Sequence, residues 1–189
     1  AVCEGEQLEN VTSLLFEDNA SAYLTGLIAG RMTETNKVGF IGGMESPVIS
    51  KFDYGFRAGV KAANPDAEVM VQYANSFTDS ALGKTIANQM HSKNADIIFT
   101  CAGAVGIGAI EAAKENGKKA IGVDQDQNSL APENVITSAM KNIDVAVVEL
   151  LSKVVDGSYK GGEVIINTLA MNGVGIPQSS EKNVPPDVL

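Results

Sequence analysis

Acidic and amide side chains crowd the segment 124–127, Asp-Gln-Asp-Gln, directly after the apolar run 120–123. That run is short enough to be a buried strand. In open parallel sheets, ligands bind beyond the carboxyl ends of the strands. A carboxylate there can accept paired hydrogen bonds from vicinal hydroxyls, such as those of ribose or another sugar. Asp124 is therefore a candidate ligand-binding residue, although a solvated loop is an equally simple interpretation of the segment.

Two further charged residues are expected at the same edge of the sheet. Asp18 follows the apolar run 11–16, and Lys141 follows the short strand expected at 135–138. Either could be an ordinary surface charge. Three polar side chains at the ends of parallel strands nevertheless favour a ligand-binding edge.

Phe77 is a large aromatic residue in the otherwise polar loop 75–79. Most aromatic residues belong to the core, and we expect Phe40, Phe56 and Phe99 there. An aromatic ring at the ligand edge can instead stack on a flat ring, which is worth ~1 kcal/mol beyond area burial.

Gly103, Gly106 and Gly108 lie in a small-residue segment, 100–108, between an expected strand and an expected helix. A dinucleotide-binding turn has the spacing G-x-G-x-x-G and an acidic residue about 20 positions further on. Asp124 fits the second requirement, but the glycine spacing here is G-x-x-G-x-G. We therefore favour glycines that let the chain turn sharply into a helix, with backbone N–H groups that could line a polar ligand.

Catalytic and metal chemistry have little support in the sequence. His91 is the only histidine, it falls within an expected helix beside Ser92, and the motif G-x-S-x-G is missing. The spacing of Cys3 and Cys101 gives neither a metal-binding nor a redox motif. We expect no enzyme activity, no cofactor and no metal.

Composition narrows the class of protein further. The 189 residues carry a formal net charge of -9, which argues against binding to a nucleic-acid backbone. No apolar run approaches the roughly 18 residues that a membrane-spanning helix needs. The hydrophobic fraction of 44% is ordinary for a globular protein.

Strands and helices are expected to alternate along the whole chain, which predicts an α/β fold with a largely parallel sheet. Ser46 is expected to cap a helix that begins at Pro47, and an acidic or Asn residue to cap the helix that begins at 20. Gly26 and Gly30 allow close packing against a neighbouring helix. In the helix at 143–156, we expect Val145, Val148, Leu151 and Val154 or Val155 to face inward. Strands are expected at 11–16, 38–41, 68–73, 97–99, 120–123, 135–138 and 163–169, and helices at 20–33, 48–63, 80–92, 109–116 and 143–156.

Four segments, 16–26, 37–44, 55–60 and 121–127, together resemble the basic membrane protein family. Its members are the substrate-binding lipoproteins of nucleoside ABC transporters, of the purine nucleoside receptor type. The resemblance covers nearly the whole chain, with its motifs in the right order.

The resemblance implies a periplasmic-binding-protein fold whose two α/β lobes close on a nucleoside. The base would stack on an aromatic ring, and Asp and Lys side chains would hold the ribose hydroxyls. By the family pattern, the ligand-binding residues are Asp18, Phe77, Gly103, Gly106, Asp124 and Lys141.

The chain departs from the family pattern at both ends, because it starts after the D-x-S-F-N motif and lacks the closing helix expected beyond Leu189. We therefore expect a fragment. It would hold one nearly complete second lobe, 19–123 plus 159–189, and a remnant of the first lobe, 1–18 plus 124–158. Such a remnant would expose apolar surface, so self-association of the truncated chain is an open alternative. Cys3 is expected to end a strand of the missing lobe rather than to carry a lipid.

The function that the resemblance implies is capture of purine nucleosides and their delivery to an ABC permease. The protein would be extracytoplasmic, and lipid-anchored through a segment that is not in this chain. Two alternatives remain: a sensory or regulatory ligand-binding domain on the same fold, and an α/β enzyme that uses Asp124 on the ribose of a nucleotide cofactor.

Overall fold

The computed structural model describes residues 8–189. Cys3, and the strand expected at it, lie outside the described residues. The strands are β1 (Ser13–Phe16), β2 (Lys37–Gly42), β3 (Glu68–Tyr73), β4 (Ile97–Cys101), β5 (Lys119–Asp124), β6 (Val135–Lys141), β7 (Val164–Asn167) and β8 (Val174–Gly175). The helices are α1 (Asp18–Met32), α2 (Pro47–Ala63), α3 (Ser80–Ser92), α4 (Ala104–Glu115) and α5 (Ile143–Val155), with short 3-10 helices at Asn128–Leu130 and Gln178–Lys182.

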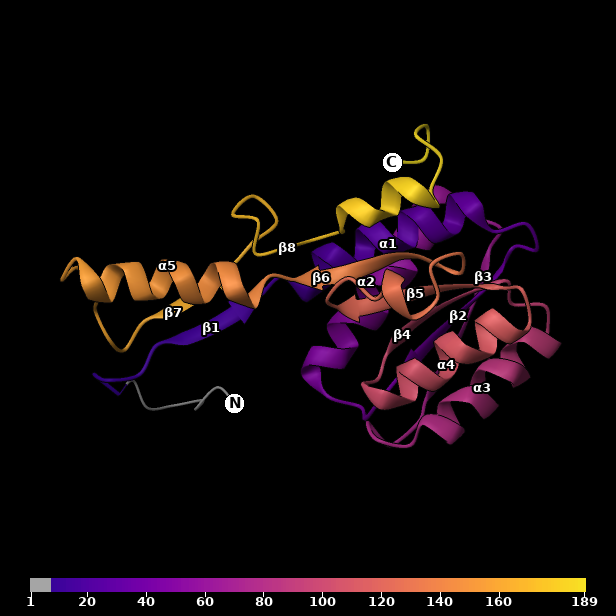
Figure 1. Cartoon of the computed structure of the whole chain (residues 1–189), viewed down its shortest axis with the longest axis horizontal. Coiled ribbons are helices and arrows are strands. Elements are labelled where there is room, and N and C mark those ends of the chain that lie inside the picture. Colours follow the sequence, from indigo (N-terminus) through magenta and orange to yellow (C-terminus); the bar gives the residue numbers. More distant parts are fainter. Residues whose placement is uncertain (1–7) are drawn as a thin grey trace.

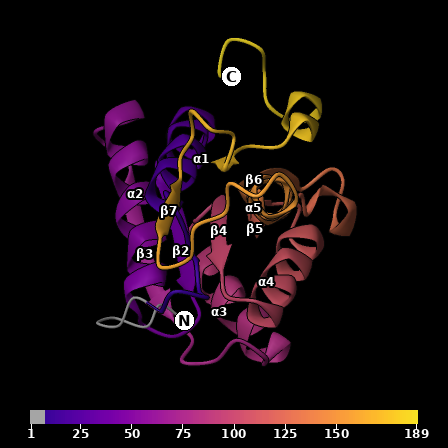
Figure 2. The ribbon, with the colours of Figure 1, turned by 90° about the vertical axis from the view of Figure 1, so that its left-hand side faces the viewer.

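A six-stranded sheet forms the larger part of the molecule, which we call the body. Its strand order is β3-β2-β4-β5-β6-β8, and all neighbours are parallel except β6 and β8. Helices α1 and α2 cover one face of the sheet, and α3 and α4 cover the other (Figures 1 and 2). The α/β class with a largely parallel sheet is thus confirmed. The strand, helix and strand expected between 97 and 123 form the parallel crossover unit β4–α4–β5.

Each face of the sheet packs its own hydrophobic cluster. Phe40 and Phe99 lie with Phe52 and Phe56 of α2, and the ring centroids of Phe56 and Phe99 are 5.1 Å apart. Ile41, the neighbour of Phe40 along β2, packs on the opposite side with residues of α3 and α4. This alternation is the two-residue period of a strand that is buried on both faces.

Close contact between α1 and α2 depends on glycines, as expected for Gly26 and Gly30. A Cβ atom on Gly26 would overlap the carbonyl oxygen of Phe56, and one on Gly59 would overlap that of Tyr23. The two helix backbones therefore approach each other more closely than any side chain would allow.

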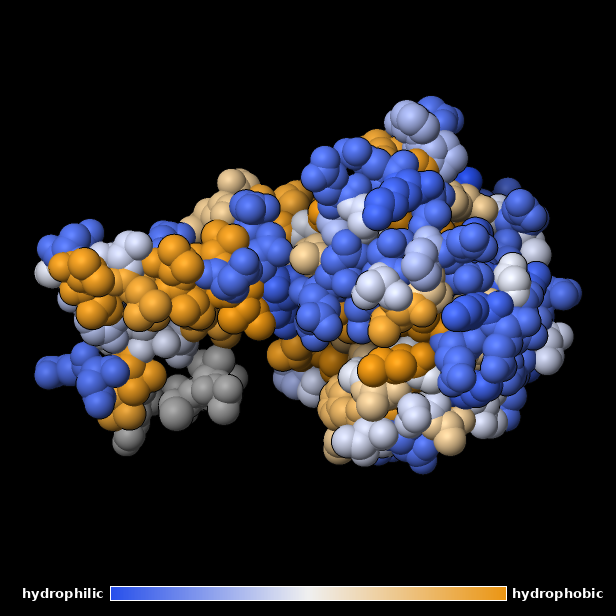
Figure 3. All heavy atoms as spheres, viewed as in Figure 1, coloured by the Kyte–Doolittle hydropathy of each residue, from blue (hydrophilic) through white to orange (hydrophobic). Residues whose placement is uncertain are grey.

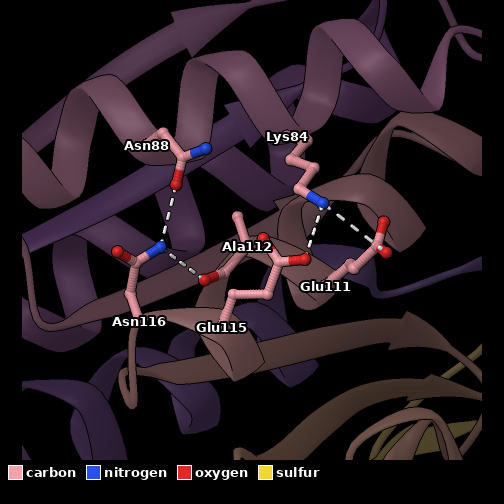
Figure 4. A network of polar contacts seen from close by, with 6 residues as sticks. All are labelled: Lys84, Asn88, Glu111, Ala112, Glu115 and Asn116. Atoms are coloured by element: carbon pink, nitrogen blue, oxygen red, sulfur yellow. Dashed lines mark hydrogen bonds and ion pairs between the residues drawn. The ribbon is translucent and has the colours of Figure 1, made fainter.

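A polar network on the surface joins α3 to α4 (Figure 4). The Lys84 ammonium lies 2.8 Å from Oε1 of Glu115 and 3.6 Å from Oε1 of Glu111. Asn116 donates to Oδ1 of Asn88 over 2.8 Å and to the Ala112 carbonyl over 2.7 Å. These contacts hold the outer sides of the two helices together.

The smaller part of the molecule, which we call the arm, consists of β1, β7 and α5. β1 pairs with β7 in parallel, with Leu14 opposite Ile165 and Phe16 opposite Asn167. The arm projects from the carboxyl edge of the large sheet, and much of its surface is hydrophobic (Figures 1 and 3).

The boundary between arm and body does not follow the expected division into lobes. β6 was expected with the first-lobe remnant, but it pairs with β5 inside the large sheet. β7 was expected with the second lobe, but it pairs with β1 in the arm. The chain therefore crosses between arm and body near Glu17, Asn142 and Thr168.

Several local expectations were wrong. α4 begins at Ala104, not at 109, because Gly103 (φ 58°) turns the chain into the helix early and Gly108 packs directly on the Ser80 carbonyl of α3. α1 begins at Asp18, after Glu17, without a side-chain cap. β6 extends to Lys141 and does not end at 138, and the segment after 169, for which no helix or strand was expected, contains β8 and a 3-10 helix.

The inward face expected for α5 was also wrong. Val148, Leu151, Val154 and Val155 are exposed, and Ala146 is the one buried residue among those of this helix. Apolar residues lie on most of the surface of α5. Within the described residues, however, the helix packs against the rest of the protein along only one narrow side.

Candidate functional site

Lys141 lies at the carboxyl edge, where β6 leaves the large sheet and the chain continues toward α5. Its ammonium lies 2.9 Å from Oδ1 of Asp18 and 3.7 Å from Oδ1 of Asp124. The same ammonium lies 5.4 Å from the ring centroid of Phe52 and 5.7 Å from that of Phe16, within cation–π range. Lys141 is therefore held in place by two carboxylates and two aromatic rings.

Asp18 is the buried partner in this cluster. It is the first residue of α1, where the partial positive charge of the helix N-terminus favours an anion. Burial nevertheless raises the pKa of the Asp18 carboxyl above its ordinary value, and the hydrogen bond and charge of Lys141 only partly oppose this. Asp18 therefore reaches Lys141 as the first residue of α1, and it does not cap that helix.

Asp124 is the exposed partner. It ends β5 in the left-handed region (φ 65°), which Asp tolerates better than most residues. Behind it, the Gln127 side chain accepts a hydrogen bond from the Val123 amide over 3.0 Å. The hydrogen bond to the Gln127 side chain therefore fixes the turn after β5. The Asp124 carboxylate remains accessible to solvent and to a ligand.

A cavity of about 450 Å³ opens beside Asp124 and Lys141. This volume falls within the roughly 300–1,000 Å³ of small-molecule sites. The body contributes Gly103, Ile107 and part of the turn after β5, and the arm contributes Ile143 and Asp144 at the start of α5.

Phe77 is not one of the residues that line this cavity, but its backbone contacts Gly103, which is. Its ring rests on Gly43, where a Cβ atom would overlap the ring, and 40% of the residue remains exposed. Its carbonyl oxygen accepts a hydrogen bond from the Ala104 amide over 2.8 Å, next to Gly103 in the cavity wall. The loop of Phe77 is thus attached to the same wall, with the ring outside the core.

The structure brings Asp18, Asp124, Lys141 and Gly103 to one edge, with Phe77 beside them. Gly106 lies apart from the cavity wall: it is inside α4, its amide donates to the Gly103 carbonyl, and a Cβ atom on it would lie 2.9 Å from Thr100 Oγ1. Gly106 therefore allows α4 to pack on β4.

Sequence reasoning missed several residues of this edge. Phe16 and Phe52 hold Lys141 from distant segments, and no local pattern indicates such a contact. Ile107 lies one helical turn beyond Gly103, so a search one turn past that candidate could have found it. Asp144 is the second residue of α5, which starts two residues after Lys141 ends β6.

Residues 8–189 contain no group of three or more His, Cys, Asp or Glu side chains arranged to hold a metal ion. Among the same residues, no helix has both the length and the apolar character to cross a membrane. Burial lowers the pKa of His91, whose Nδ1 is 2.9 Å from the Ala95 carbonyl oxygen.

Comparisons with known proteins agree with this architecture. The family model described as "ABC transporter substrate-binding protein PnrA-like" matches residues 1–188. Basic membrane protein B of Borreliella burgdorferi is 41% identical, over 92% of this chain and 52% of its own. The ABC transporter nucleoside-binding protein BmpA of Lactococcus lactis is 42% identical, over 89% of this chain and 53% of its own. The chain thus spans about half the length of the curated relatives it matches.

Solved structures of known proteins also match this chain in fold. An ABC transporter solute-binding protein from Aeropyrum pernix matches with a TM-score of 0.85 and 31% identity, over 94% of this chain and 52% of that one. A transcriptional activator of the comK gene from Bacillus halodurans matches with a TM-score of 0.87 and 27% identity, over 96% and 62%. The periplasmic-binding-protein-like fold is therefore confirmed, and the chain belongs to the PnrA-like family of ABC transporter substrate-binding proteins.

Proposed function

We propose that this chain carries the nucleoside-contacting edge of an ABC transporter substrate-binding protein, which hands purine nucleosides to a permease without altering them chemically. The observation that carries the proposal is the fixed ammonium of Lys141 beside the exposed carboxylate of Asp124, at the wall of a cavity. The names of relatives support it, since one of them is a nucleoside-binding protein.

The geometry fits the chemistry of a ribose. Asp18 neutralises Lys141 from the buried side, so the remaining N–H groups of Lys141 are available toward the cavity. Asp124 accepts hydrogen bonds from the same side, and a vicinal diol offers both donors and acceptors. Phe77 would stack on the base, and Asp18 would act mainly through Lys141.

The location of the protein follows from the same proposal. A substrate-binding component of an ABC importer works outside the cytoplasm, and the resemblance to lipoproteins points to a lipid anchor on the complete protein. The permease subunit is its protein partner.

Isothermal titration calorimetry tests the proposal directly. We expect the 189-residue chain to release heat with at least one of guanosine, adenosine and inosine, with a dissociation constant on the order of millimolar because one cavity wall is open. Ribose and glucose should bind more weakly. No heat with nucleosides, alongside clear binding of a free sugar, would overturn the proposal.

Two variants test whether the nucleoside binds at this edge of the sheet. Lys141→Met should weaken binding about tenfold or more, because a charge-assisted hydrogen bond is worth roughly 1.5–3 kcal/mol. Val71→Ala, on the outermost strand β3, is the matched control and should leave binding unchanged.

A second candidate function is a sensory domain that reports nucleosides to a regulatory partner. The match to a transcriptional activator favours it, because that protein shares the fold at 27% identity. The coding sequence upstream of Ala1 separates the two: a lipoprotein signal supports transport, and a DNA-binding or kinase domain supports sensing.

A further inference from the structure

Gly43 follows the last residue of β2 and lies against the ring of Phe77, at the carboxyl edge of the large sheet. The three atoms nearest to a Cβ placed on Gly43 all belong to that ring. The Cβ would overlap Cε1 and Cδ1 of Phe77 and would lie 2.8 Å from Cζ. Non-bonded carbon atoms pack at about 3.5–4.0 Å, so any side chain at position 43 would displace the ring by roughly 1 Å.

The backbone of residue 43 does not itself require glycine. Its φ angle lies outside the left-handed region, which Gly103 does occupy (φ 58°). Alanine at position 43 would therefore meet no backbone strain of that kind. The reason for a glycine here is the ring of Phe77.

The backbone on both sides of Phe77 is held, so the ring must move when a side chain is added at 43. Before Phe77, the Asn75 amide donates to the Gly43 carbonyl oxygen over 2.9 Å. After it, the Phe77 carbonyl oxygen accepts from the Ala104 amide over 2.8 Å. The same carbonyl oxygen lies 2.8 Å from the place of a Cβ on Gly103. The loop is thus seated on two glycines, one after β2 and one after β4.

The ring keeps surface for a ligand while Gly43 supports it. Phe77 is 40% exposed, and that exposed surface is what a flat base can cover. Stacked rings prefer a defined offset, and the groups of a binding site must be held within about 0.5 Å of their working geometry. A displacement of roughly 1 Å, as carbon–carbon packing distances require, is therefore enough to spoil the stack.

We propose that Gly43 is a positioning residue for nucleoside binding. Because it has no side chain, it fixes the Phe77 ring where the base of a purine nucleoside stacks, and so it controls the affinity for the base and not the affinity for the ribose. Gly43 acts through Phe77 and needs no contact with the ligand. The inference rests on the proposed function.

NMR titrations of the 189-residue chain with inosine and with ribose test the inference. Gly43→Ala should weaken inosine binding about tenfold, within the range that loss of a base–aromatic stack produces, and should leave ribose binding unchanged. Gly175→Ala is the matched control, since the nearest atom to its added Cβ is 3.9 Å away, and it should change neither. Equal weakening of inosine and ribose by Gly43→Ala would indicate a general distortion of the edge and overturn the proposal.

A double-variant cycle tests whether Gly43 acts through the ring. Phe77→Ala should weaken inosine binding about tenfold. Adding Gly43→Ala to Phe77→Ala should cause little further loss, because the new methyl group then meets no ring. A further tenfold loss in the absence of the ring would overturn the proposal.

The ring can also be observed without a ligand, in the chain with isotope-labelled phenylalanine rings. Phe77→Ala identifies the Phe77 ring signals by their disappearance. Gly43→Ala should shift these signals, and Gly175→Ala should leave them in place. Unshifted Phe77 signals in Gly43→Ala would overturn the proposal, whatever the nucleoside titrations show.

Failure of the proposed function gives a different pattern from failure of this inference. If the unmodified chain binds no inosine, or if Phe77→Ala leaves inosine binding unchanged, stacking of a base on Phe77 is contradicted and the role of Gly43 in binding is contradicted with it. If Phe77→Ala weakens inosine binding and Gly43→Ala does not, only the role of Gly43 is contradicted. Circular dichroism shows whether each variant is folded, and an unfolded Gly43→Ala chain would contradict the claim that the new methyl group meets only the ring.

Discussion

Lys141 and Asp18 form an ion pair that is largely enclosed, which makes both residues important to folding as well as to binding. The side chain of Lys141 is 17% exposed and that of Asp18 5%. Removing one partner of a buried pair leaves the other charge without compensation, which typically costs 3–5 kcal/mol.

Lys141→Met should therefore lower the free energy of unfolding by about 3 kcal/mol, measured by urea denaturation near neutral pH. Lys153→Met is the matched control. Lys153 pairs with Glu149 on the exposed surface of α5, where an ion pair is worth about 0–1 kcal/mol. A double variant, Asp18→Asn with Lys141→Met, should recover much of the loss. Equal costs for Lys141→Met and Lys153→Met would contradict the buried-pair interpretation.

The buried carboxyl of Asp18 also predicts a dependence of stability on pH. Burial, the larger cause, raises the pKa of Asp18 in the folded chain above 3.8. The folded state then holds this proton at pH values where the unfolded state has released it. The contribution to stability is full below the unfolded pKa of about 3.9 and is lost as pH rises through the folded pKa.

Urea denaturation between about pH 4 and pH 7 measures this effect. The stability of the unmodified chain should fall with rising pH relative to Asp18→Asn, whose side chain does not titrate. Parallel curves for the two proteins would show that Asp18 has no raised pKa.

For these individual residues, the sequence predicted where they lie in the fold but not which side chains they contact. Asp124 and Lys141 could be placed at one edge because each ends a strand of the large sheet. Asp18 was expected at the same edge, but the strand before it, β1, belongs to the arm, and the start of α1 brings Asp18 there. The ion pair could not be predicted, since it depends on the exact start of α1. The rings of Phe16 and Phe52 around Lys141 come from segments whose approach only the folded chain defines.

Among the elements, the α1–α2 pair shows most clearly how sequence controls packing. Gly59→Ala should destabilise the chain by about 2 kcal/mol, because the new methyl group overlaps the Tyr23 carbonyl and the helices must separate. Gly175→Ala in β8 is the control, since the nearest atom to an added Cβ is 3.9 Å away, and its effect should stay within about 0.5 kcal/mol. Thermal denaturation measures both, and a neutral Gly59→Ala would show that the helices tolerate separation.

Most of the elements could be predicted from apolar periodicity and turn residues. β3 and α3 have the expected bounds, and the Ser46 side chain caps α2 by accepting a hydrogen bond from the Ile49 amide, as expected. The start of α4 was missed because glycines were interpreted as a loop. In the structure, Gly106 and Gly108 are helical, since tight packing against Thr100 and α3 outweighs the low helix propensity of glycine.

The whole molecule is a complete α/β body with an incompletely covered arm. The orientation of α5 could not be predicted from its sequence, because a helix that is apolar on most sides gives no direction for its inward face. The sequence did indicate that part of the chain would expose apolar surface, but it placed β6 and β7 on the wrong sides of the division.

This difference between arm and body predicts different local stabilities. Amide hydrogens of β7 should exchange with solvent much faster than those of β4, because β7 has one neighbouring strand and β4 is buried between two. Hydrogen exchange followed by mass spectrometry measures this. Equal protection of β7 and β4 in the isolated chain would contradict the incomplete state of the arm.

The central claim is that a purine nucleoside binds at the carboxyl edge of the large sheet, and an NMR titration of the isotope-labelled chain with guanosine tests it most directly. The account predicts shifts of the backbone amides of Gly103, Asp124 and Gln125 that grow with guanosine and saturate, and that ribose reproduces only in part. Shifts confined to the opposite edge, around Asp96 and Gly117, or no shifts at all, would contradict it.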